Sequence, residues 1–224
     1  MARGRRRAWW IVGGVLALLA LGLGLGPLVY AALEEDAAAA PTVQAQPSDV
    51  ELAPSTDGTW AIGPGSSAGY RVDEVLNGAN VTVAGTTGQV AGSVAVQGGD
   101  MASAEVTVDV ASISTDSGQR DAYFRSNVMD VATHPTATFT VQGPVDLPEL
   151  SGTPVTVPVS GDLTLRGQTR PVQADLAVVR TAEGVEVSGA VPVVFSDFGI
   201  SAPDLGFVRV EDRGQIEFLL ELTM

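Results

Sequence analysis

Apolar side chains recur at every second position along most of the chain after Thr59. The stretch AEVTVDV (104–110) places alanine and valine on one face and glutamate, threonine and aspartate on the other. The same alternation runs through 70–72, 137–141, 159–165, 172–178, 185–195 and 215–222. Half-buried antiparallel strands have this pattern, because successive side chains of a strand point to opposite faces. The sequence therefore predicts an all-β domain.

Glycine-containing turn signals separate these segments. They lie at Asn77-Gly78, Gly98-Gly99-Asp100, Arg166-Gly167-Gln168 and Glu183-Gly184. About eight strands, each with one apolar face and with little helix between them, either stack as two sheets or close into a barrel. Many inward positions are Val, Ala or Gly, and only 5% of the chain is aromatic. Small inward side chains leave room for a ligand in an eight-stranded barrel, and they equally suit two closely packed sheets, so the alternation alone leaves both open.

The N-terminal region predicts a single membrane-spanning helix. Residues 1–8 are basic, residues 9–33 are uncharged and long enough to cross a bilayer, and three acidic residues follow. The positive-inside rule then places residues 1–8 in the cytoplasm and the rest of the chain outside, as a single-pass cell-membrane protein. A cleaved signal peptide followed by secretion is the alternative, although the apolar region of a signal peptide is normally shorter.

Residues 34–58 have the composition of a flexible linker. They are rich in Ala, Pro and acidic residues and show no sustained periodicity. As a free coil they would have an end-to-end distance of about 25–30 Å. The sequence therefore predicts a folded domain over 59–224 that is joined to the membrane helix by a tether.

Charge and cysteine content exclude several classes of function. The chain has 26 acidic residues, 12 arginines and no lysine, and only eight of the arginines follow residue 33. Such an acidic domain is a poor partner for nucleic acid. Cysteine is absent, which excludes disulfides, thiolate metal sites and thiol nucleophiles.

The one histidine, His134, is the only candidate for a base at neutral pH. No serine nucleophile motif and no second histidine accompany it, so we predict a structural or rim position, with no catalytic residue, no metal and no cofactor. Upstream, Asp116 can cap a short helix, with Gln119 three residues on, and Arg120 can form an ion pair that fixes this helix to a loop. Tyr123 and Phe124 would then cover an open barrel end.

Four blocks of sequence resemble the YceI-like family. They are SISTDSGQRDAYFRSNVMDVATHPTATF (112–139), GDLTLRGQTRPV (161–172), FSDFGI (195–200) and VEDRGQIEFLLEL (210–222), and they occur in the order and spacing of that family. The resemblance covers about 59–224. It implies an eight-stranded, antiparallel, lipocalin-like barrel with one or two short helices, which binds a long apolar chain such as a polyisoprenoid or a fatty-acyl chain.

This resemblance predicts a membrane-tethered lipid carrier, store or sensor that exchanges its ligand with a membrane-protein donor or acceptor. The alternatives are an envelope interaction domain with a filled core and an enzyme acting on a lipid. As lining we expect Tyr70, Val72, Val108, Phe139, Leu163, Leu176, Val193, Phe195 and Phe218, and at the mouths Phe124, Met129, Phe198 and Phe207.

Overall fold

The computed structural model describes residues 37–53, 55–76 and 78–224. The predicted basic N-terminus and membrane helix lie outside these ranges. Within the described residues, no helix is both long enough and apolar enough to cross a membrane. The strands are β1 (Gly58–Ile62), β2 (Ser67–Leu76), β3 (Ala79–Thr87), β4 (Val90–Gln97), β5 (Asp100–Asp109), β6 (Thr136–Asp146), β7 (Val155–Leu165), β8 (Gln168–Arg180), β9 (Gly184–Val194), β10 (Val208–Val210) and β11 (Arg213–Thr223).

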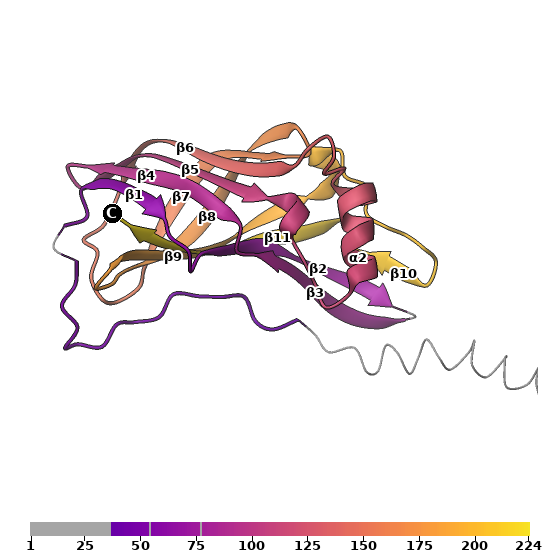
Figure 1. The fold of residues 1–224 in the computed structure, drawn as a ribbon, viewed down its shortest axis with the longest axis horizontal. Coiled ribbons are helices and arrows are strands. Elements are labelled where there is room, and N and C mark those ends of the chain that lie inside the picture. The colour runs from indigo at the N-terminus through magenta and orange to yellow at the C-terminus, as the bar shows by residue number, and fades with distance from the viewer. Residues whose placement is uncertain (1–36, 54, 77) are drawn as a thin grey trace, which may run out of the picture.

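Eight of these strands form a closed antiparallel barrel (Figure 1). Their order around the ring is β1, β4, β5, β6, β7, β8, β9 and β11, and β11 pairs back onto β1. Two residue pairs close this seam, Ala61 with Thr223 and Ile62 with Leu222. The closed ring shows that the strands form a barrel and not two stacked sheets, the two architectures that the alternation left open.

A long hairpin extends the barrel at one end. β1 and β2 lie one after the other along β11, and both pair with it. On their other side, β3 pairs with β2, and β4 pairs with β1. β10 continues beyond β11 on the same edge of β2, where Val208 lies opposite Leu76. Strands β2, β3 and β10 thus project past the closed ring (Figure 1).

Short helical segments cover the same end. They are the 3-10 turn η1 (Val110–Ser112), the helix α2 (Gly118–Tyr123), the π-helical turn η2 (Phe124–Val128) and the 3-10 turn η3 (Phe195–Phe198). The expected cap of α2 is corrected: Ser117 is the N-cap, and its hydroxyl accepts a hydrogen bond from the Arg120 amide. Asp116 instead forms an ion pair with the Arg120 guanidinium, one turn further on.

Residues 37–53, which we call the strap, lie along the outside of the barrel (Figure 1). The Ala37 amide donates to Thr82 O in β3, and the Val43 amide donates to Ser188 Oγ in β9. Ala53 donates its amide to Thr181 O and accepts from Arg180. The composition of 34–58 predicts a free coil, yet these contacts hold most of it against the wall.

Candidate functional site: two apolar cavities in one barrel

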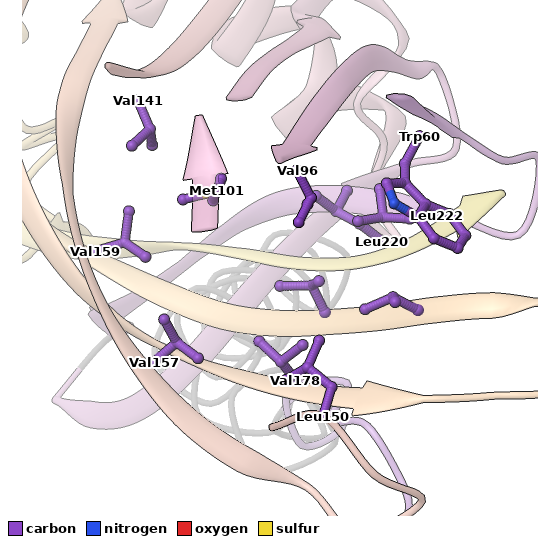
Figure 2. Close-up of a cluster of buried hydrophobic side chains, with 12 residues drawn as sticks. Trp60, Val96, Met101, Val141, Leu150, Val157, Val159, Val178, Leu220 and Leu222 are labelled. Carbon is purple, nitrogen blue, oxygen red and sulfur yellow. The ribbon is translucent and has the colours of Figure 1, made fainter. Parts of the chain in front are cut away.

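The first cavity fills the end of the barrel where β1 begins. It has a volume of about 140 Å³, and only Thr56 and Thr138 among its lining residues are polar. Figure 2 shows the valine, leucine, methionine and tryptophan side chains around it, which come from strands on several sides of the barrel. Dry apolar cavities of about this size bind small hydrocarbons. The first cavity is therefore suited to an apolar ligand.

Trp60 and a loop close the outer end of this cavity. The Trp60 side chain is only 2% exposed, and its Nε1 donates a hydrogen bond of 2.8 Å to Thr56 O. Leu147 and Leu150, from the segment between β6 and β7, line the cavity beside it. The predicted lining did not include these three residues; the aromatic side chain of Trp60 at the start of the domain is the sequence signal that could have indicated it.

The second cavity lies at the opposite end, under α2 and η2. It has a volume of about 170 Å³. Its walls come from β2, β3, β9 and β10 as well as from the helical turns, and Tyr123, which is 37% exposed, lies at its rim. Unlike the first cavity, it has charged residues in its lining: Arg71, Glu74 and Arg120.

Four residues belong to the walls of both cavities: Ala68, Val108, Ala137 and Ile216. We call this set the waist. Two of the four are alanines, and the other two are the branched residues Val108 and Ile216. The two cavities are therefore neighbouring parts of one apolar interior.

All nine predicted lining residues and two of the four predicted mouth residues lie on these walls. Phe139, Leu163, Leu176 and Phe218 line the first cavity, Tyr70, Val72, Phe124, Met129, Val193 and Phe195 line the second, and Val108 lines both. Phe198 is buried at 2% exposure within the packed core, and Phe207 is 57% exposed on the outer surface, so neither lines a cavity. Contact of the eleven with a ligand stays a prediction.

The charged rim of the second cavity is internally paired. Arg71 Nε donates to Glu217 Oε1 at 2.6 Å, and a second guanidinium nitrogen donates to Ala38 O of the strap. Arg120 pairs with Asp116. Both guanidinium groups thus have a carboxylate partner. Arg71 points to the outside of β2, beneath the strap, and Glu74 adds a carboxylate to the lining, so the rim presents no excess of positive charge to an entering group.

An aromatic stack stands between the rim and the interior. The rings of Tyr70 and Phe124 have their centroids 4.8 Å apart and are inclined by 20°. Burial raises the pKa of the Tyr70 hydroxyl to about 12, partly offset by the nearby Arg120 charge. Tyr70 is therefore neutral at physiological pH and contributes an apolar ring to the wall.

Buried Asp121 fixes α2 over the second cavity. Its Oδ1 accepts hydrogen bonds from the Thr115 amide at 2.9 Å and from the Thr115 hydroxyl at 2.8 Å. These bonds tie the helix to the preceding loop. The sequence analysis assigned this role to an ion pair of Arg120. The structure shows that the hydrogen bonds from Thr115 to the buried Asp121 carboxylate act together with the Arg120–Asp116 pair.

His134 lies outside both cavity linings. Its imidazole packs over the β7–β8 turn, where a Cβ on Gly167 would come within 2.8 Å of Cε1. Gly167 also has a positive φ of 71°, so the turn requires glycine for two reasons. Among the residues described, no group of three or more His, Asp or Glu side chains is placed to hold a metal ion.

The fold and its interior define the chain as a closed, eight-stranded antiparallel barrel with an apolar cavity. The sequence matches the YceI-like domain over residues 60–222, and the chain belongs to this family. This confirms the resemblance of the four sequence blocks.

Solved structures share the fold. A polyisoprenoid binding domain from Saccharophagus degradans, implicated in plant cell wall breakdown, superposes with a TM-score of 0.61 at 21% identity, over 77% of this chain and 99% of that one. BcnA of Burkholderia cenocepacia gives a TM-score of 0.56 at 24% identity, over 79% of this chain and 100% of that one. No curated protein matches the sequence significantly.

Proposed function

We propose that the barrel binds one long apolar lipid, a polyisoprenoid or a fatty-acyl chain, and acts at the outer face of the cell membrane as a carrier, store or sensor. The observation that supports this most directly is the pair of apolar cavities joined at the waist. Membership of the YceI-like family and the polyisoprenoid-binding relative support the same ligand class.

The dimensions of the interior favour a chain over a compact ligand. Two neighbouring cavities that share four lining residues suit a flexible molecule that extends from one into the other. Burying about 400–600 Å² of such a chain contributes roughly 10–15 kcal/mol before association and ordering costs are subtracted. We expect binding of micromolar affinity or tighter.

The paired rim favours a ligand whose polar end is uncharged. A phosphate or carboxylate at the second cavity would have to compete with Asp116 for Arg120, and would lie near the Glu74 carboxylate of the lining. A quinone, alcohol or amide head would neither break this pair nor be repelled by Glu74. We therefore expect neutral prenyl or acyl lipids to bind more tightly than their phosphorylated or acidic forms.

Mass spectrometry tests the proposal. A protein that begins at Ala37, expressed in a bacterium and purified without detergent, is weighed under native and denaturing conditions. An added mass that leaves on denaturation and extracts as a prenyl or acyl chain is the expected result. A protein that stays bare after incubation with prenyl alcohols, quinones and fatty acids would favour the envelope interaction domain instead.

A matched pair of variants locates the ligand. Leu176 lines the first cavity from β8, so Leu176→Glu places a charge in the apolar interior and should abolish uptake. Gln173→Glu, on the same strand with an exposed side chain, should bind like the unaltered protein. Equal uptake by a folded Leu176→Glu protein would place the ligand elsewhere.

A further inference from the structure

The loop before β10 carries two exposed apolar side chains at the end of the barrel that holds the second cavity. Leu205 is 49% exposed and Phe207 is 57% exposed. We call the four residues Asp204–Phe207 the tip. Leu205 and Phe207 are two of only five large hydrophobic residues that are exposed within the described chain. Exposed apolar groups gathered on a loop mark contact with a membrane or with a protein.

The tip has a defined shape. The Leu205 amide donates to Val208 O, and the Gly206 amide donates to Asp204 Oδ1 at 3.1 Å. Gly206 adopts a positive φ of 82°, as a tight turn requires. The two apolar side chains are therefore presented on an ordered turn.

The tip stands directly on the wall of the second cavity. Pro203 and Val210, which flank it, both line that cavity, and the Val210 amide donates to Pro203 O. A surface that received the tip would therefore lie against the rim through which a ligand enters or leaves.

The strap brings the N-terminal side of the chain to the same end. Ala37 is bonded to Thr82, which lies opposite Asp73 on β2, and Asp73 is three residues from Leu76, the partner of Val208. Three residues of strand correspond to about 10 Å. The start of the strap and the tip thus lie at one end of the molecule.

This placement limits how far the barrel can be from the bilayer. The sequence predicts a membrane-spanning helix that ends at residue 33. Four peptide units from there to Ala37 span at most about 14 Å. A free linker over 34–58 would allow about 25–30 Å and any orientation. Docking of the strap therefore holds the second-cavity end towards the membrane.

We infer that the tip inserts into the outer surface of the lipid bilayer and docks the second cavity against it, so that the ligand passes between membrane and barrel without crossing water. This inference rests on the proposed lipid-binding function and on the predicted membrane helix. The partner is an uncharged or zwitterionic lipid surface, because the acidic excess of the domain opposes anionic lipids.

Depth-dependent quenching tests the docking. The full chain has no native cysteine, so Leu205→Cys and Glu183→Cys each give one labelling site, the second in the β8–β9 turn at the opposite end. Both proteins are labelled with an environment-sensitive dye in phosphatidylcholine vesicles. The Leu205→Cys label should be quenched by doxyl groups on the lipid chains and protected from aqueous iodide, and the Glu183→Cys label should show the reverse. Equal iodide quenching at both sites, or protection of the Leu205→Cys label from both quenchers, overturns the inference.

Ligand exchange gives a second readout. Leu205→Asp should slow transfer of a fluorescent prenyl or acyl chain between protein and vesicle about tenfold, because the tip loses its apolar anchor. Met224→Asp, at a more exposed apolar position next to Gly58 of β1, should leave the rate unchanged. Equal rates for the two variants overturn the role of the tip in exchange. Failure of the unaltered protein to hold any lipid would contradict the proposed function, while the quenching result would still report docking.

Discussion

Val108 on β5 and Ala137 on β6 are direct antiparallel partners, and both line both cavities. Directly opposed residues point to the same face of a sheet, so this pair forms one side of the waist. Because the Ala137 side chain is a single methyl group, it leaves space beside Val108 that a larger side chain at this position would fill.

Ala137→Phe should divide the interior. A phenyl ring at the waist would keep a long chain out of one cavity, and each 100 Å² of chain surface left unburied costs about 2.5 kcal/mol. We expect long prenyl or acyl chains to bind more than tenfold more weakly, and short ones to be unaffected. Titration with chains of increasing length measures this.

Thr136→Phe is the matched control for the waist. Thr136 is the preceding residue of β6 and is exposed on the outside of the barrel. It should leave the length dependence as it is. If Ala137→Phe retains full affinity for long chains, the two cavities do not hold one ligand together.

Tyr70 should make stability depend on alkaline pH. Burial raises the pKa of Tyr70 to about 12 from an ordinary value of 10. The stabilisation is complete below pH 10 and is lost as the pH rises towards 12, because the unfolded chain ionises first. The loss should be about 1–3 kcal/mol.

Chemical denaturation at pH 9 and pH 11.5 measures that loss. The chain has no lysine, so few other groups titrate in this interval. Tyr70→Phe keeps the ring stacked on Phe124 and removes the ionisable hydroxyl, and it should flatten the dependence. An equally steep fall in the Tyr70→Phe protein would assign the effect to other groups.

Asp121→Ala should destabilise the fold by about 2–3 kcal/mol. The substitution removes two hydrogen bonds from a buried carboxylate and leaves the Thr115 donors without their acceptor. Asp116→Ala breaks an ion pair whose carboxylate is 71% exposed, and should cost less than about 1 kcal/mol. Thermal unfolding of both variants gives the comparison, and equal losses would mean that Asp121 has no special role in holding α2.

Val43→Asp should release the strap. Val43 is 7% exposed, and its amide is bonded to Ser188. A buried charge at this site should raise hydrogen exchange of the amides of Val43 and Ala53 at least tenfold and leave the barrel strands protected. Thr42→Asp places the same charge at an exposed neighbour and should change little. Slow exchange in both proteins would show that Val43 does not hold the strap.

The alternation of apolar residues was sufficient to predict the barrel strands from β5 onward, because each has one face towards the interior. It did not reveal β4 as a strand. Nor did it show that the two arms of the long hairpin are each interrupted, one into β1 and β2 and the other into β3 and β4. The outward face of β4 has Ala91, Ser93 and Ala95 where other strands have charged residues, so its alternation is less marked. Closure of the ring depends on pairing between residues that are distant in sequence, and local patterning contains no information on it.

The candidate lining was predictable wherever a large apolar residue lay on an inward face. Phe207 has no assigned face, because its loop lies outside the alternating pattern; its exposed ring lies on a loop whose flanking residues Pro203 and Val210 line the second cavity, and its predicted position at a mouth stays a prediction. The strap was missed for a related reason: its composition is that of a coil, and its position depends on single contacts such as Val43 with Ser188. Tertiary contacts of this kind override local composition.

Strand β11 pairs with β9 along its whole length and also with β2 and β1. It follows every other strand in the chain. Until it is in place, three strands keep unpaired edges, and such edges invite association with other chains. During folding the domain must therefore pass through an open, incomplete sheet, and a chain shortened before Arg213 should aggregate instead of folding into a smaller barrel.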